Sequence, residues 1–191
     1  MLNPIKSLAG FGVFETYYFY LAFSIPDPQP NRSTIMALQK GDKAPHFKLI
    51  SSDKKEVSLA DYHDKNLVVL FFPMAFTSVC TTELCSMRDT LNDYTQLNAD
   101  VVAISVDSPF TLEKFKADQH FNFPLLSDFN KEASAAYGSM YENFVFGLKS
   151  VSKRSAFVID KQGIVQYAEV LENAGEIPNL EAVKQTLASL N

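Results

Sequence analysis

The chain has 191 residues, of which 47% are hydrophobic and 20% charged, and its formal net charge is −5 at pH 7. This composition is ordinary for a globular domain and excludes a disordered acidic chain, a collagen-like fibre and a multi-span membrane protein. The negative charge argues against a nucleic-acid partner and against a polybasic membrane patch.

The first 35 residues differ in amino-acid composition from the rest of the chain. The run Leu8–Ile25 is rich in Phe and Tyr, but Glu15 interrupts it and leaves it short for a membrane span. Residues 26–30 read Pro-Asp-Pro-Gln-Pro, which cannot lie inside a helix, and no small-residue cleavage site precedes them. We therefore expect residues 1–35 to be a poorly ordered extension or the product of a start assigned too far upstream. Residues 36–191 are expected to form one domain without stable membrane association.

Strands and helices begin to alternate soon after residue 38. Residues 47–50 and 57–59 predict two short strands. Residues 66–72 read Asn-Leu-Val-Val-Leu-Phe-Phe, a continuous apolar run typical of a strand buried on both faces of a sheet. One helix is then predicted over residues 80–97, because apolar side chains recur at spacings of three and four. These are Leu84, Met87, Leu91, Tyr94 and Leu97.

The second half of the chain continues the alternation. Residues 100–106 predict another buried strand, and Ser108-Pro109 begins a helix to about residue 119, because proline suits the first helical turn. The remaining predicted elements are a strand at 123–126, a helix at 131–137, a hairpin of strands 155–159 and 164–170, and an amphipathic helix at 178–190. This order predicts an α/β fold with a central mixed β-sheet flanked by helices.

The chain has only two cysteines, Cys80 and Cys85. This number excludes a disulfide framework and a four-thiol zinc site; it leaves a redox pair, a nucleophile beside a bystander, or two inert core thiols. Cys80 follows a buried strand and a short loop, and lies in the first turn of a predicted helix. Unpaired N–H groups and the positive end of the helix dipole stabilise a thiolate there, and the thiolate is the nucleophilic form of cysteine.

Two neighbours of Cys80 have side chains that suit this position. Thr77 can place its hydroxyl beside the sulfur or beside an oxygen that the sulfur attacks, and Glu83 can fold back on the helix start as in a capping box. Taken alone, Cys80 fits equally well as a small core residue. The loop favours a functional role, because residues 73–80 read Pro-Met-Ala-Phe-Thr-Ser-Val-Cys, a specific pattern at a strand-to-helix corner.

This loop resembles the active-site signature of the peroxiredoxins. Their proline, their threonine or serine four positions on, and their peroxidatic cysteine three positions further are matched by Pro73, Thr77 and Cys80. Residues 153–160 look like the family's Arg-x-x-Phe-hydrophobic-Ile-Asp strand, with Arg154 as its arginine. The resemblance covers roughly residues 38–191 and implies a thioredoxin-like fold. Within the family, the loop and the C-terminal half look most like the alkyl-hydroperoxide-reductase-E-like branch.

The resemblance implies a thiol-dependent peroxidase that reduces H2O2 and organic hydroperoxides through a sulfenic acid at Cys80. Thr77 and Arg154 would orient the peroxide and stabilise the leaving oxygen, and Pro73 would shield the sulfur. Thioredoxin or a similar dithiol protein would recycle the enzyme, with no metal, haem or flavin cofactor. Homodimers are common in the family, and the loop around Phe76 is the candidate contact. The alternative is a non-enzymatic peroxide sensor that passes its oxidation to a partner protein.

Cys85 has the spacing of the resolving cysteine in the Q-type (bacterioferritin-comigratory) branch, which E-like members often lack. On an ideal helix, five residues advance about 7.5 Å and turn a net of about 140°, so the two thiols point to nearly opposite faces. A Cys80–Cys85 disulfide therefore requires the start of the helix to unwind. We expect Cys85 or an external thiol to resolve the Cys80 sulfenic acid, and we expect two reactive thiols to belong in a reducing cytoplasm.

Other classes of thiol protein fit the sequence less well. A cysteine–histidine hydrolase needs a catalytic base, and none of His46, His63 and His120 has a setting typical of one. A disulfide oxidoreductase would carry Cys-x-x-Cys rather than two cysteines five positions apart. Two thiols without a nearby histidine in sequence also make a poor metal site.

Overall fold

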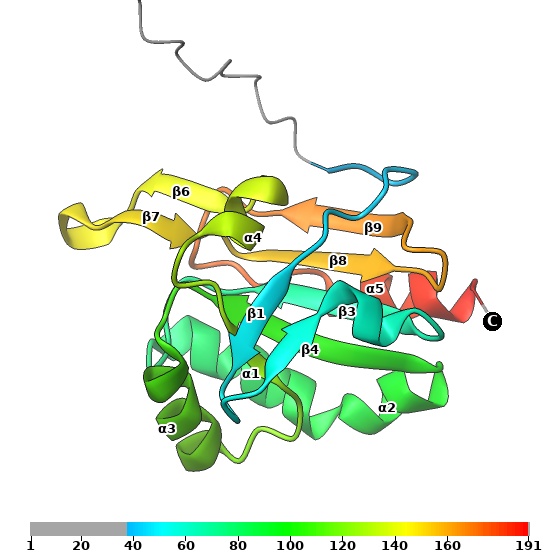
Figure 1. Cartoon of the computed structure of the whole chain (residues 1–191), viewed down its shortest axis with the longest axis horizontal. Helices are drawn as coiled ribbons and strands as arrows, with labels where there is room; N and C mark the ends of the chain where they lie inside the picture. Colours follow the sequence, from blue (N-terminus) through cyan, green and yellow to red (C-terminus); the bar gives the residue numbers. More distant parts are fainter. Residues whose placement is uncertain (1–37, 191) are drawn as a thin grey trace, which may run out of the picture. The chain divides into compact units, whose positions relative to one another are not determined.

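The computed structural model describes residues 38–190, so the predicted extension at residues 1–35 lies outside the described residues (Figure 1). The strands are β1 (Lys48–Ser51), β2 (Glu56–Ser58), β3 (Asn66–Phe71), β4 (Ala99–Ser105), β5 (Leu125–Ser127), β6 (Met140–Asn143), β7 (Lys149–Ser152), β8 (Ser155–Ile159) and β9 (Val165–Val170). The helices are α1 (Ser78–Asp89), α2 (Leu91–Gln96), α3 (Pro109–Gln119), α4 (Glu132–Ala136) and α5 (Leu180–Ala188), with short 3-10 turns η1 (Leu59–Tyr62) and η2 (Val145–Gly147). None of the helices in this range is long and apolar enough to cross a membrane.

A seven-stranded sheet in the order β2-β1-β5-β4-β3-β8-β9 forms the centre of the fold. Strands β3, β4 and β5 are parallel neighbours, whereas β8 and β9 pair in antiparallel fashion beside β3. The predicted mixed sheet flanked by helices is therefore confirmed, and Figure 1 shows the helices packed around it. Because β3 and β4 are parallel, the loops that follow them meet at one edge of the sheet, which is where ligands bind in α/β folds.

Two hydrophobic clusters lie on opposite faces of this sheet, because successive strand residues point to opposite sides. One cluster joins Val68 and Leu70 to side chains from α1, α2, α3 and α5. The other joins Val69 and Phe71 to α4 and to the segment before β1. This explains the continuous apolar run at residues 66–72, since both faces of β3 are covered.

The single helix predicted over residues 80–97 is wrong, because α1 and α2 are separated at Thr90. Thr90 has φ −109° and ψ 10°, and its hydroxyl donates a hydrogen bond to the Ser86 carbonyl oxygen at 2.9 Å. A threonine side chain that bonds its own helix backbone in this way favours a bend. The apolar spacing does not reveal the break, because Met87 before it and Tyr94 after it stay fully buried.

Strands β6 and β7 form a separate two-stranded antiparallel sheet that the sequence did not predict. Its tip, residues 145–148, exposes apolar side chains, and Phe146 there has φ 59°. Buried serine pairs tie the hairpin to the body of the fold, with Ser155 donating to Ser139 at 2.8 Å and Ser134 bonded to Ser152 at 2.9 Å. Polar anchoring of this kind leaves no period-two apolar pattern, which is why the hairpin escaped prediction.

Candidate active site

The loop between β3 and α1 is held from two sides. Asp107, just after β4, accepts hydrogen bonds from the Ala75 backbone N–H and from the Ser105 hydroxyl, each at 2.8 Å. Phe76 has φ 63°, a left-handed conformation that costs a non-glycine residue about 1–3 kcal/mol. Its ring packs against Phe115 of α3 with centroids 4.8 Å apart, which stabilises that conformation. These contacts fix the conformation of the loop and therefore the position at which α1 begins.

Cys80 lies in the first turn of α1, as predicted, and is 1% exposed. The helix begins at Ser78 with Thr77 as its N-cap, so Cys80 is the third helical residue. The first N–H groups of a helix have no intrahelical partners, and they bear the positive end of its dipole. The sulfur thus combines an apolar surrounding, shared with Phe72 and Leu84, with a helix terminus that favours negative charge.

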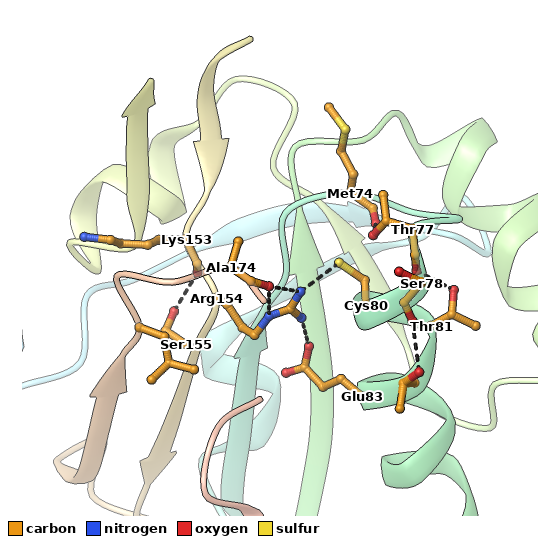
Figure 2. Close-up of polar contacts among 12 residues, drawn as sticks. Met74, Thr77, Ser78, Cys80, Thr81, Glu83, Lys153, Arg154, Ser155 and Ala174 are labelled. Atoms are coloured by element: carbon orange, nitrogen blue, oxygen red, sulfur yellow. Dashed lines mark hydrogen bonds and ion pairs between the residues drawn. The ribbon is translucent and has the colours of Figure 1, made fainter. Parts of the chain in front are cut away.

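The predicted partner Arg154 does reach Cys80 (Figure 2). Arg154 connects β7 to β8, is 1% exposed, and donates from Nη2 to the Cys80 sulfur at 3.3 Å. Its Nε and Nη2 also donate to the Ala174 carbonyl oxygen at 3.1 and 2.9 Å, and its Nη1 donates to the Glu83 carboxylate. The structure therefore brings the cysteine and arginine together and fixes the guanidinium plane with two further acceptors.

The charges at this site are coupled through Arg154. Burial opposes the charged guanidinium, but the Glu83 carboxylate and the Cys80 sulfur favour it more strongly and raise the pKa of Arg154. Burial also raises the pKa of Glu83 to about 7, although Arg154 acts in the opposite direction. The Glu83 oxygen that does not meet Arg154 is buried and has no hydrogen-bond partner among residues 38–190. The site therefore holds a permanent cation between a sulfur and an acid that titrates near neutrality.

The predicted capping role of Glu83 is wrong. The carboxylate does not return to the helix start; it lies fully buried against Arg154. The reason is the helical period, since residues three apart lie on the same face, and Cys80 and Glu83 both point towards the protein interior. A buried carboxylate needs a charged or hydrogen-bonding partner, and Arg154 is the partner that the fold supplies.

Pro73 lies just after β3 and Thr77 is the N-cap residue of α1, and the roles predicted for both residues stay predictions. The Thr77 hydroxyl donates to the Met74 carbonyl oxygen at 3.0 Å, and its side chain makes no capping bond to the helix (Figure 2). A hydroxyl engaged in this way still has lone pairs that can accept a hydrogen bond from a peroxide. Pro73 is buried at the end of β3, between the strand and the exposed part of the loop.

Cys85 is a free thiol with surroundings different from those of Cys80. It is partly exposed, and its sulfur donates to the Gln119 side-chain oxygen at 3.6 Å, at the end of α3. Cys80 instead faces Arg154, so the two sulfurs contact different elements from different sides of α1. In this structure the two cysteines are not bonded, and the predicted unwinding of α1 remains a prediction.

Three contributors to the site were missed or misassigned from the sequence. The Glu83 ion pair follows from the i, i+3 spacing to Cys80, which could have marked both residues as inward-facing. Asp107 ends a strand parallel to the one before the cysteine loop, and that topology could have placed it beside the loop. The Ala174 carbonyl carries no sequence signal, because any residue supplies a backbone acceptor.

The fold and this site define a class: an α/β protein with one buried cysteine at a helix N-terminus, held against a buried arginine. Residues 40–168 match the model of the AhpC/TSA family. The chain therefore belongs to this family, which includes the peroxiredoxins.

Relatives and solved structures agree. A Mycobacterium tuberculosis protein that carries a peroxiredoxin name is 42% identical over 134 residues, 69% of this chain and 85% of the relative. The mitochondrial thioredoxin-dependent peroxide reductase of Mus musculus is 36% identical over 154 residues, 75% of this chain and 56% of the relative. Peroxiredoxin Q of Xylella fastidiosa superposes with a TM-score of 0.71 at 27% identity, over 80% of this chain and 96% of that one. The predicted thioredoxin-like fold and the resemblance to the peroxiredoxins are confirmed. Of the two branches that the sequence suggested, E-like for the loop and Q-type for the second cysteine, the comparisons support the Q type.

Proposed function

We propose that the protein is a thiol-dependent peroxidase that reduces hydrogen peroxide and organic hydroperoxides at Cys80. The observation that carries this function is the hydrogen bond from the Arg154 guanidinium to the Cys80 sulfur, 3.3 Å long, at a helix N-terminus. A fixed cation beside the sulfur complements a negatively charged nucleophile and is placed to stabilise the charge that develops on the peroxide. No observation favours the sensor alternative.

In the first step, the Cys80 thiolate attacks one peroxide oxygen in line with the O–O bond. A sulfur–oxygen bond forms, the O–O bond breaks, and the second oxygen leaves with the electron pair and takes up a proton to give water or an alcohol. Donors that already point into the site stabilise this leaving oxygen without reorganising. Arg154 is the donor placed for it, with Thr77 as the hydroxyl that orients the peroxide.

In the second step, a thiol attacks the Cys80 sulfenic acid, a disulfide forms and water leaves. We assign this role to Cys85, with an external thiol as the alternative. A thioredoxin-type dithiol protein then reduces the disulfide, as the name of the mouse relative indicates for that protein. The chemistry requires no metal, haem or flavin.

The test is the intact mass and the free-thiol count after one equivalent of H2O2, for wild type, Cys85→Ser and Cys80→Ser. We expect wild type to lose two hydrogens and both thiols, Cys85→Ser to gain one oxygen, and Cys80→Ser to remain unchanged. If wild type also stops at one added oxygen, an external thiol resolves Cys80. An unchanged wild-type mass would refute the peroxidase function.

We further propose a homodimer that meets at the Phe76 loop and α3, in a reducing compartment such as the cytoplasm. Phe76, whose ring packs on Phe115 of α3, is 51% exposed, and Phe110, at the start of α3, is 71% exposed, so both carry a large apolar ring into solvent. Two free thiols support the reducing compartment. Sedimentation velocity tests the dimer: Phe110→Asp should give a monomer, and a monomeric wild type would refute it.

A further inference from the structure

The orientation of the Arg154 guanidinium depends on a segment without regular secondary structure. Residues 171–179 connect β9 to α5, and the Ala174 carbonyl in this segment accepts two of the N–H groups of Arg154. Figure 2 shows this carbonyl on the side of the guanidinium away from Glu83. Since Nη2 bonds both the Ala174 oxygen and the Cys80 sulfur, a shift of the segment would redirect the hydrogen bond to the sulfur.

Three contacts fix the beginning of this segment. The Leu171 backbone N–H donates to the Arg154 carbonyl oxygen at 2.9 Å, and the Tyr141 hydroxyl donates to the Leu171 carbonyl oxygen at 2.9 Å. The Lys153 ammonium pairs with the Glu172 carboxylate. Glu172 is largely exposed, so this ion pair is weak in water, and the Tyr141 hydroxyl is the buried side-chain anchor.

Tyr141 is well placed to act as a rigid anchor. It belongs to β6, is 9% exposed, and its ring stacks on Phe144 with centroids 5.4 Å apart. Burial raises the pKa of Tyr141, while the Arg154 backbone N–H and the Arg154 charge act in the opposite direction. The phenol therefore remains a protonated donor at neutral pH, and it lies within the electrostatic reach of the site.

We propose that Tyr141 is a positioning residue of the peroxidase reaction: its hydroxyl holds residues 171–174, whose Ala174 carbonyl aims Arg154 at the Cys80 sulfur. The proposal rests on the proposed function and on the role of Arg154 in it. It also assigns a role to the β6–β7 hairpin, which the sequence did not predict, because Tyr141 belongs to β6. Tyr141 does not touch the reacting atoms; it acts through the arginine.

The test uses two tyrosines that make the same type of bond. Tyr137 also donates its hydroxyl to a backbone carbonyl at 2.9 Å, that of Pro45, but it lies in the cluster on the opposite face of the sheet from Cys80. We expect Tyr141→Phe to lower the rate constant for Cys80 oxidation by about tenfold, because small displacements of catalytic groups are costly. Tyr137→Phe should lower the melting temperature by about as much as Tyr141→Phe does, but it should leave the rate constant for Cys80 oxidation unchanged. The rate of the later disulfide step should stay at its wild-type value in both.

A double-mutant cycle with Arg154→Lys shows whether Tyr141 acts through Arg154. We expect Tyr141→Phe to have no further effect on Cys80 oxidation in the Arg154→Lys background. Lys153→Met loosens the same segment without removing the hydroxyl, and we expect a loss of about threefold, in keeping with an exposed ion pair. Wild-type rates in both Tyr141→Phe and Lys153→Met, or an undiminished effect in the double variant, would overturn the proposal. If wild type itself is not oxidised at Cys80, the proposed function fails as well.

Discussion

At the scale of single residues, the Arg154 guanidinium does several things at once. It meets a carboxylate, a carbonyl and a sulfur in one plane, which uses the rigid fork of donors that distinguishes arginine from lysine. A lysine ammonium could supply the charge but could not bond all three acceptors from the same position. Replacing Arg154 with lysine would therefore keep the positive charge but lose the orientation of the donors.

Arg154→Lys tests the contribution of this orientation. We expect the rate constant for Cys80 oxidation by H2O2 to fall by about 100-fold, the range found when one transition-state donor is removed. The measurement is competition for H2O2 with a protein of known rate. Arg88→Lys is the matched control, because Arg88 is the other arginine of residues 38–190 and bonds Asp89 and the Gln119 carbonyl instead. A loss under threefold in Arg154→Lys would contradict the role of the fork.

Glu83 makes stability depend on pH. Its pKa is raised from 4.5 to about 7 by burial, so the folded state holds a proton that the unfolded chain has released. Its contribution to the free energy of unfolding is complete below pH 4.5 and is lost as the pH rises through about 7.

Glu83→Gln removes this titration. We expect the free energy of unfolding of wild type, relative to that of the variant, to fall by about 2 kcal/mol between pH 5.5 and pH 8. Urea unfolding across this range measures it, and the variant also keeps an oxygen that can accept from Arg154. Parallel curves for the two proteins would show that Glu83 has an ordinary pKa.

At the scale of elements, α1 carries both cysteines and imposes a conformational step. A disulfide needs Cα atoms within about 7 Å with the side chains directed at each other. Here the Cys80 sulfur accepts a hydrogen bond from Arg154, and the Cys85 sulfur donates one to Gln119. If Cys85 resolves Cys80, at least one of these contacts must break and turns of α1 must unwind.

Hydrogen exchange tests this unwinding. After one equivalent of H2O2, we expect amides of residues 78–89 to exchange at least about tenfold faster, as for a locally opened helix. The helix α5 serves as the internal control and should keep its protection. In Cys85→Ser the sulfenic acid forms without a disulfide, so α1 should stay protected. Equal protection of α1 in oxidised and reduced wild type would exclude an intramolecular disulfide.

At the scale of the whole molecule, stability depends on the two clusters that the central sheet separates. Phe157 of β8 is fully buried, and its ring meets Tyr137 and Phe71 with centroids 5.2 and 6.0 Å away. Phe146, at the tip of the β6–β7 hairpin, is 98% exposed. The same residue type therefore occupies the two extremes of burial.

Truncation of these two phenylalanines should give very different results. We expect Phe157→Ala to lower the free energy of unfolding by about 3–5 kcal/mol, because it leaves a cavity in the core. Phe146→Ala should change it by less than about 0.5 kcal/mol. Chemical unfolding of both variants measures the difference, and comparable losses would mean that the hairpin tip is covered in solution.

Much of the fold could be predicted from local patterns. The apolar runs of β3 and β4 identified strands covered on both faces, and Ser108-Pro109 correctly marked the start of α3, where the Ser108 hydroxyl accepts from the Thr111 N–H. The break at Thr90 and the β6–β7 hairpin could not be predicted in this way. The break is a local change of backbone angles at Thr90, and the hairpin is anchored by hydrogen bonds between serines. Neither feature alters the apolar spacing from which helices and strands are predicted.

By itself, the sequence determined the local part of the site: a cysteine at the start of a helix, after a buried strand and a Pro-x-x-x-Thr-x-x-Cys loop. Helix termini and apolar runs arise from neighbouring residues, so they can be inferred without the fold. Only the tertiary structure decided which groups meet the sulfur. Arg154 lies 74 positions from Cys80, 71 positions from Glu83 and 20 positions from Ala174, whose carbonyl oxygen also accepts from it. Their meeting depends on the packing of α1 against β8 and the segment after β9, which no local pattern encodes.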